Sequence, residues 1–256
     1  MATFLERVTE CEHQAYRILE AGILSTRLER ERGVALLTCP GLPGPRFNHL
    51  ALIRVPAADD AATVALARRK LAGTGISPPA LALSPASFPP TLAALAPGAG
   101  MKPWLTESWL VFERDSLATL GPMSAGRPVS RASSRGHVRA GLGLLTGQAP
   151  AESAPQNDEL ESLLWLASLQ DGAELAALIV AWKEDAVVYV GGQHAHTSAA
   201  YQGIARDVLH RQPDLARLTL VIPGPDIAAP QAVPPLPAGA WAFRRTIFAK
   251  QEGDGE

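Results

Sequence analysis

The sequence predicts an α/β protein whose mixed, mostly antiparallel central sheet is flanked by helices. Segments with helical spacing alternate with strand-like segments in both halves of the chain. Hydrophobic residues make up 47% of the 256 residues, which is enough to fill a core. The 22 glycines and 22 prolines follow no repeat, so they mark turns and connections in a globular chain.

The first half of the chain is a succession of short periodic segments. In order, they are a helix over 3–31 with Gly22 as a candidate break, strands at 34–38 and 48–55, an amphipathic helix at 58–72, a strand at 80–83, a helix near 89–96 and an alternating strand at 102–114. Acids open the 58–72 helix and bases close it, which is the order that the helix dipole favours.

The second half follows a stretch, 115–157, in which Gly, Pro, Ser and Ala dominate. Its predicted elements are a helix at 158–169, a hairpin of strands 173–182 and 186–190 with its turn at 183–185, a helix at about 199–211, and strands at 218–222 and 241–250. We therefore predict an N-terminal half at 1–115, a Pro/Gly/Ser-rich connection at 116–156 and a C-terminal core at 157–256.

Charge excludes a general nucleic-acid-binding surface. The formal net charge is −2, so no basic field would attract a polyanion. Segment 127–139 is a local exception, with four arginines, one histidine and no acid. A solvated linker is the favoured interpretation of this segment, and a phosphate or nucleic-acid contact is the alternative.

Cysteine content and hydropathy set the expected location. Cys11 and Cys39 are too few for a disulfide scaffold or a zinc site, so we expect no metal. The longest apolar run, 175–182, is far shorter than the roughly 20 residues that span a bilayer. The first ten residues are charged and contain no signal-peptide run, which predicts a cytoplasmic protein without a membrane partner.

The segment with the clearest chemical meaning is 187–224, which reads as strand, glycine-bearing loop, helix and strand. The start of a helix presents free backbone N–H groups and the positive end of the helix dipole, and together these bind phosphate. Small side chains at Ala200, Gly203 and Ala205 would let a phosphate approach those N–H groups.

This segment resembles the pyrophosphate-binding motif of the GNAT acetyltransferase superfamily, in which Gln or Arg precedes two residues, Gly, one residue and Gly or Ala. The matching run is Ala200 to Ala205, where Gly203 and Ala205 fit and Ala200 departs from the pattern. The resemblance implies acetyl-CoA as co-substrate. It places the phosphates on the N–H groups of Gln202, Gly203, Ile204 and Ala205, and the pantetheine arm along Val190 and Gly191.

The first half is also similar to a pattern found ahead of some bacterial GNAT cores. The residues that carry this likeness are Phe47-Asn48-His49, Pro78-Pro79, 81–85 and the aromatic-rich stretch 104–112. The chain is thus identified as a divergent member with tandem GNAT-like halves, the first of them degenerate. Proline-rich residues 223–240 lack the helix and the tyrosine that supply the family's usual general acid.

Several acids and histidines near the motif are candidate bases for an acetyl transfer. Glu184 and Asp185 are expected to form the hairpin turn instead. His194 and His196 would face the same side of an extended loop, and exposed loop histidines are the favoured interpretation over metal binding, catalysis or phosphate contact. Tyr201 and all five tryptophans are expected to pack against neighbouring residues. The catalytic residues therefore stay unassigned.

Two functions from different classes follow from the resemblance. The first is an N-acetyltransferase that acts on a small-molecule or peptide amine. The second is a non-catalytic GNAT-like binding or structural protein, favoured by Ala200 and by the proline-rich 223–240 stretch. A nucleic-acid accessory role for 127–139 is the third option. The sequence does not fix the oligomeric state, and a homodimer is compatible with it.

Overall fold

The computed structural model describes two compact units of the chain. Unit 1 comprises Met1–Glu107 together with Phe243–Glu256, and unit 2 comprises Ser108–Ala242. The described residues are 2–22, 26–31, 33–40, 44–55, 62, 65, 69, 80–117, 130–131, 164–168, 174–182, 184–191, 205–206, 208–210, 212–223, 236 and 238–250.

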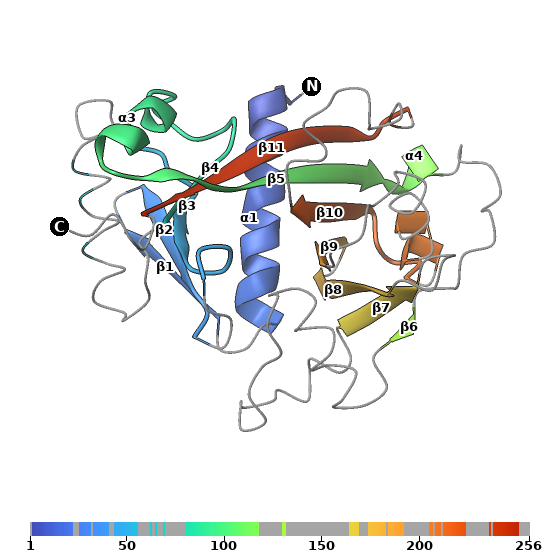
Figure 1. Ribbon diagram of the computed structural model, residues 1–256. Coiled ribbons are helices and arrows are strands. Elements are labelled where there is room, and N and C mark those ends of the chain that lie inside the picture. Colours follow the sequence, from blue (N-terminus) through green and yellow to red (C-terminus); the bar gives the residue numbers. More distant parts are fainter. Residues whose placement is uncertain are drawn as a thin grey trace. The chain divides into compact units, whose positions relative to one another are not determined.

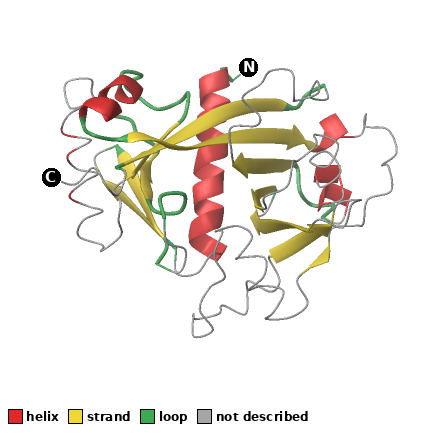
Figure 2. Ribbon diagram, in the orientation of Figure 1, coloured by secondary structure: helices red, strands yellow, loops and turns green. Residues whose placement is uncertain are grey.

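Unit 1 begins with a long helix, α1 (Phe4–Gly22), drawn in red in Figure 2. Thr3 and Glu6 form a capping box at its start, because the N–H of each residue donates to the side chain of the other. The buried apolar residues of α1 recur at steps of three or four and form one face: Val8, Cys11, Ala15, Ile18 and Leu19.

The sheet of unit 1 contains four strands and a segment of a fifth from the first half of the sequence, and a strand segment from the end of the chain (Figure 1). Its strands are β1 (Arg27–Glu31), β2 (Val34–Thr38), β3 (His49–Ala51), β4 (Ala80–Leu83), β11 (Trp241–Ala249) from Phe243 onward, and β5 (Lys102–Glu113) as far as Glu107, in that spatial order. The pairings β1–β2, β2–β3 and β4–β11 are antiparallel, and β3–β4 is parallel.

Helices cover both faces of this sheet. The short helix α3 (Leu92–Gly98) buries Leu92 and Ala96 in a cluster with residues of β2, β3, β4 and β11. On the other face, Tyr16 of α1 contacts His49 of β3 and Arg245 of β11.

Unit 2 has a sheet in which antiparallel strands also lead into one parallel pair. It contains β5 from Ser108, α4 (Arg114–Leu117), β6 (Ser130–Arg131), β7 (Leu164–Ser168), β8 (Glu174–Trp182), β9 (Asp185–Gly191), β10 (Arg217–Pro223) and the first two residues of β11. The strand order is β6-β7-β8-β9-β10-β5. The pairings β6–β7, β7–β8 and β8–β9 are antiparallel, and β9–β10 is parallel. The mixed, mostly antiparallel sheet flanked by helices is thus confirmed.

The two units do not follow the predicted boundaries at 115 and 157. Strand β5 leaves unit 1 after Glu107, and β11 enters it at Phe243. Each unit therefore contains a strand segment from the other half of the sequence. Composition gave no sign that the segments of β5 from Ser108 and of β11 from Phe243 belong to the other unit. Both segments lie outside the Pro-rich connection that marked the predicted boundary.

The structure corrects two predicted helices. Residues 27–31 form strand β1, although helical spacing had extended the first helix to 31. Residues 164–168 form strand β7 within the segment predicted as a helix at 158–169. In both cases tertiary pairing with a neighbouring strand prevails over local spacing.

Several other expectations can be checked among the described residues. Trp109 is fully buried as expected, whereas Trp104 is 48% exposed and is not a core residue. Both cysteines are buried and unbridged. Residues 62, 65 and 69 are helical, and the rest of the 58–72 helix lies outside the described residues. No helix among the described residues is long and apolar enough to cross a membrane.

Gly33, in the turn before β2, lies against the backbone of Arg54. Its φ is +81°, and its carbonyl accepts the N–H of Arg54 at 2.7 Å. A Cβ atom added at Gly33 would lie 2.1 Å from the carbonyl oxygen of Arg54. Any side chain at this position must therefore displace the backbone beside β3.

We expect Gly33→Ala to lower the free energy of unfolding by about 3 kcal/mol, because it combines a positive φ with a backbone clash. Gly44 has a φ of +102° but open space around it, so Gly44→Ala should cost about 1 kcal/mol. Gly98→Ala, with open space and no positive φ, is the control and should be nearly neutral. Urea denaturation measures all three, and equal losses for Gly33→Ala and Gly44→Ala would contradict the clash.

Candidate functional site

The end of the parallel ladder in unit 2 is the geometric feature closest to the predicted acyl-CoA site. Strands β9 and β10 pair from Asp185↔Arg217 to Tyr189↔Val221. On its other side, β9 stays paired with β8 as far as Gly191↔Ala176. Within the described chain, β9 thus continues for two residues beyond its ladder with β10. Pro223, at the end of β10, has no N–H with which to extend that ladder.

A helix crosses between these two strands and packs on the sheet. Residues 205, 206 and 208–210 are helical, within the helix predicted over 199–211. Ala205, Val208 and Leu209 are buried in one cluster with Val190 of β9 and Ile222 of β10. The spacing of the three helical residues puts them on one helix face. A crossover helix between parallel strands begins on the side of the carboxyl end of the first strand, which is the side on which α/β proteins bind phosphate ligands.

The other end of this helix is held by Arg114, the first residue after β5. Its guanidinium donates to the carbonyl of Leu209 at 3.1 Å, of Gln212 at 2.6 Å and of Leu215 at 2.7 Å. Nearby, Arg217 forms ion pairs with Glu113 at 3.1 Å and with Asp185 at 3.9 Å. The amino ends of β9 and β10 are therefore tied to the end of β5.

The structure covers only part of the predicted site. Val190 and Ala205 are fully buried in the same cluster, and Gly191 is the last residue of β9. Gln202, Gly203 and Ile204 lie outside the described residues, as do Tyr201, His194 and His196. Of the candidate bases, Glu184 is exposed in the hairpin turn and Asp185 begins β9, so both lie at the end of β9 away from Gly191.

Unit 1 contains a second parallel pair, and this pair is closed. Leu50 of β3 pairs with Leu81 of β4, and Arg54 forms a further parallel bridge with Phe88. Phe88 donates to the carbonyl of Ile53 at 2.9 Å and accepts the N–H of Val55 at 3.1 Å. These hydrogen bonds occupy the backbone groups that an extended ligand would need. Leu52, at φ +51°, is the kink that precedes the closure.

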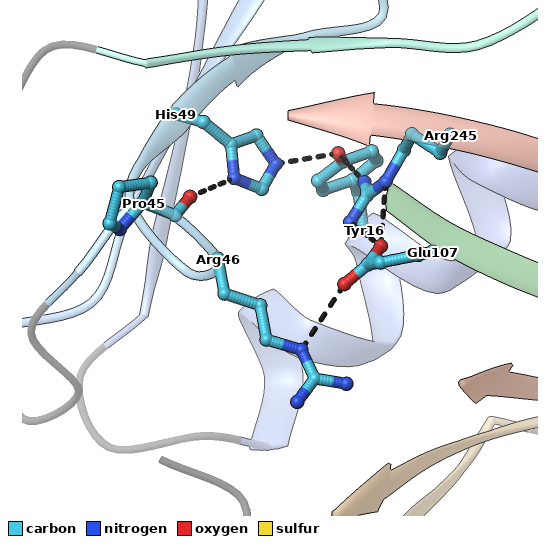
Figure 3. Close-up of polar contacts among 6 residues, drawn as sticks. All are labelled: Tyr16, Pro45, Arg46, His49, Glu107 and Arg245. Atoms are coloured by element: carbon cyan, nitrogen blue, oxygen red, sulfur yellow. Dashed lines mark hydrogen bonds and ion pairs between the residues drawn. The ribbon is translucent and has the colours of Figure 1, made fainter. Parts of the chain in front are cut away.

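Unit 1 also holds a buried polar cluster that the sequence did not reveal (Figure 3). Glu107 of β5 lies at its centre. Its carboxylate accepts Arg245 Nη2 at 2.7 Å and Nε at 3.0 Å, and Arg46 Nε at 3.1 Å. Arg245 Nη1 also donates to the hydroxyl of Tyr16. Glu107, Arg245 and Tyr16 are at most 1% exposed, and Arg46 is 7% exposed.

The hydrogen bonds of His49 fix its tautomer. Nδ1 lies 2.9 Å from the carbonyl of Pro45, which only accepts, so Nδ1 carries the proton. Nε2 therefore accepts the hydroxyl of Tyr16 at 2.8 Å. Burial, and then the charge of Arg245, lower the pKa of His49 to about 3. The imidazole is accordingly neutral at physiological pH.

Glu12 extends the cluster along α1. It accepts the hydroxyl of Ser84 at 2.7 Å, and burial raises the pKa of its carboxyl against the opposing charge of Arg245. Asn48 satisfies local backbone as expected, because it accepts Cys39 N–H at 2.7 Å and donates to the carbonyl of Gly44 at 2.9 Å. The cluster thus ties α1, the 44–49 segment, β5 and β11 together in unit 1.

This cluster has the chemistry of a structural lock. Its central members are almost fully buried, and their hydrogen bonds join Glu107, Arg46, Arg245 and Tyr16 to one another. Among the described residues, no group of three or more His, Cys, Asp or Glu side chains could hold a metal ion. A buried ion pair of this kind specifies one arrangement of its strands more than it adds net stability.

Comparison with known proteins identifies the fold. No family model matches the sequence, and none of the curated proteins matches it. A GCN5-related N-acetyltransferase from Kribbella flavida superposes with a TM-score of 0.64 at 15% identity, covering 99% of this chain and 98% of its own. A conserved protein of Staphylococcus epidermidis ATCC 12228, described as functionally unknown, gives 0.52 at 13% identity and covers 91% of this chain and 98% of its own.

The chain therefore has the fold of the GNAT acetyltransferases, as the sequence predicted. The match spans nearly all of both chains, so it includes both units. In each unit, antiparallel strands are followed by one parallel pair of strands. Helical residues lie between the two strands of that pair in the sequence, which agrees with the predicted two-half architecture. At 15% identity the fold is what the two proteins share.

We expect Glu107→Gln to lower the free energy of unfolding by about 3–5 kcal/mol, because it leaves two buried arginines without a carboxylate. The matched control is Glu113→Gln on the same strand, whose partly exposed pair with Arg217 should be worth less than about 1 kcal/mol. Chemical denaturation at neutral pH measures both variants. Similar losses for the two would contradict the lock.

The pKa of His49 also sets a pH dependence. The folded-state pKa of about 3 lies below the unfolded value of 6.5, so the unfolded state binds the proton first as the pH falls. The contribution of His49 is complete above pH 6.5 and declines toward pH 3, by at most about 1.4 kcal/mol per pH unit. The raised pKa of Glu12 acts in the opposite sense, since its cost grows as the pH rises above 4.5.

The difference between wild type and His49→Gln isolates this effect. Gln can still accept the Tyr16 hydroxyl but does not titrate. Wild type should lose more stability than the variant between about pH 7 and pH 5, as measured by urea denaturation. Parallel pH profiles would show that His49 is not held neutral by burial.

Proposed function

We propose that the chain is an acyl-CoA-dependent N-acetyltransferase whose acyl-CoA site lies in unit 2. The observation that carries the proposal is the end of the β9–β10 ladder at Tyr189↔Val221, with the described helical residues packed in the same cluster as Val190. Within the described chain, the register of β9 with β10 ends before Val190 and Gly191, the last two residues of β9. Such backbone can bind an extended pantetheine arm as an added strand would.

The predicted motif supplies the other half of the site. The N–H groups of Gln202 to Ala205 would bind the CoA phosphates, with Gly203 allowing close approach. The amine of a small molecule or peptide would attack the thioester carbonyl. A C–N bond then forms, the C–S bond breaks, the amine gives up its proton to a base, and CoA leaves as its thiol. Backbone N–H groups would support the charge on the carbonyl oxygen.

One acyl-CoA is expected for each chain. The corresponding pair in unit 1 is closed by the hydrogen bonds of Phe88 with Ile53 and Val55. The Ile53 carbonyl and the Val55 N–H, which would have to bind an extended ligand in unit 1, are thus already hydrogen-bonded to Phe88. The function that competes with this proposal is a GNAT-like protein that binds without catalysis, favoured by Ala200 and by residues 223–240.

Acetyl-CoA should raise the melting temperature of the protein, because a ligand that binds only the folded state stabilises it by about 2.7 kcal/mol at a hundred times its Kd. Gly203→Glu should abolish the shift, since it fills the phosphate position and adds a negative charge there. Gly98→Glu is the matched control, because it adds the same charge where a new Cβ meets nothing within 4 Å. Calorimetry of wild type should give a stoichiometry of one.

Two outcomes would overturn the proposal. Absence of a thermal shift at millimolar acetyl-CoA would exclude the site, and a shift that survives Gly203→Glu would place it elsewhere. Thiol release from acetyl-CoA in the presence of a panel of amines then separates catalysis from binding. Stabilisation without release on any amine would favour the non-catalytic alternative.

A further inference from the structure

The contacts of Arg114 suggest a role beyond holding the fold of unit 2 together. This residue follows β5, and its backbone N–H donates to the carbonyl of Ala216 at 2.9 Å, just before β10. Its side chain donates to three further carbonyls, those of Leu209, Gln212 and Leu215. The acceptors lie in the last described turn of the helix, at Leu209, and in the connection from the helix to β10.

Two of them, the carbonyls of Leu209 and Gln212, lie at the end of the helix, where a helix leaves its last carbonyls without an intrahelical partner. They also carry the negative end of the helix dipole, which a cation stabilises. The planar guanidinium spreads its N–H donors over a fixed fork, so one arginine can bond to three carbonyls at once. A lysine at this position would bring the charge but not the fork.

Two constraints together set the position of the helix on the sheet. Its buried face, Ala205, Val208 and Leu209, packs on the strands and fixes its height over the sheet. Apolar packing of small side chains resists sliding along the axis only weakly, because it has no direction. The hydrogen bonds of Arg114, at 2.6–3.1 Å, are directional and therefore fix the position of the helix end.

We propose that Arg114 is a positioning residue for the phosphates of acyl-CoA. This inference rests on the proposed function, because it places those phosphates at the opposite end of the same helix. Backbone N–H groups bind phosphate only within hydrogen-bond distance, so a small axial shift of the helix would weaken all of these contacts together. The pantetheine arm would bind to β9 and would not depend on the helix.

This difference between the two parts of the ligand provides the test. Arg114→Met should weaken CoA binding about tenfold or more, since displacements of about 1 Å in a binding site have effects of this size. The affinity for pantetheine, measured by NMR titration, should change less than about twofold. Arg114→Lys should restore only part of the loss, because it keeps the charge without the fork.

Arg217→Met is the matched control. Arg217 lies at the same end of unit 2 and is also partly buried, and its side chain forms ion pairs with Glu113 and Asp185. Both variants should lose stability, but only Arg114→Met should lose CoA affinity. Equal loss of CoA affinity in the two variants would overturn the proposal, as would an equal loss of affinity for CoA and pantetheine in Arg114→Met.

Hydrogen exchange separates this inference from the proposed function. If wild type does not bind CoA, the proposed function fails, and the positioning role fails with it. If wild type binds CoA, the amides of residues 208–210 should exchange faster in Arg114→Met than in Arg217→Met. Equal exchange in the two variants would show that Arg114 does not hold the helix, and would contradict the inference even with CoA binding intact.

Discussion

The proposed function depends on the backbone hydrogen bonds at the carboxyl ends of two parallel strand pairs. A parallel pair needs a crossover between its strands, and here helical residues lie between them in both units. In unit 1, Phe88 bonds to Ile53 and Val55 and closes the pair. In unit 2, the ladder ends at Tyr189↔Val221 while β9 continues to Gly191. Two pairs of the same type thus end differently: one has backbone hydrogen bonds across its end, and the other has a strand that outlasts its ladder.

The other conspicuous features hold these strand ends in place. The Glu107 carboxylate joins two buried arginines to α1 through Tyr16, so α1, β5 and β11 are fixed in one arrangement within unit 1. In unit 2, Arg114 does the same for the helix that covers β9 and β10. Both devices use arginine, whose several donors can bond to groups from different elements at once.

Much of the fold could be predicted from the sequence, because periodicity reports local structure well. Strands β2, β4, β5, β8, β9, β10 and β11 fall where alternation or apolar runs placed them. Strand β7 could not be predicted, since an isolated short apolar segment fits a helix or a strand equally well. The exchanged segments of β5 and β11 could not be predicted either, because pairing between distant strands leaves no local pattern.

One feature of the sequence does indicate the buried cluster. Phe243, Arg245 and Ile247 share one face of β11, and all three are buried, so an arginine in the inward phase of a strand indicates a buried partner. Glu107, within the apolar strand β5, is the matching acid. Their pairing still required the tertiary structure, because 138 residues separate them.

Hydrogen exchange with and without CoA tests the central contrast most directly. Alternate amides of a strand point to opposite neighbours, so one of the two amides of Val190 and Gly191 faces away from β8. That amide should exchange rapidly in the free protein and slow when CoA is added, whereas Val55 and Phe88 should be slow in both states. The account would be contradicted if the amides of Val190 and Gly191 were both protected from exchange without CoA. It would also be contradicted if CoA slowed exchange at Val55 and Phe88 instead.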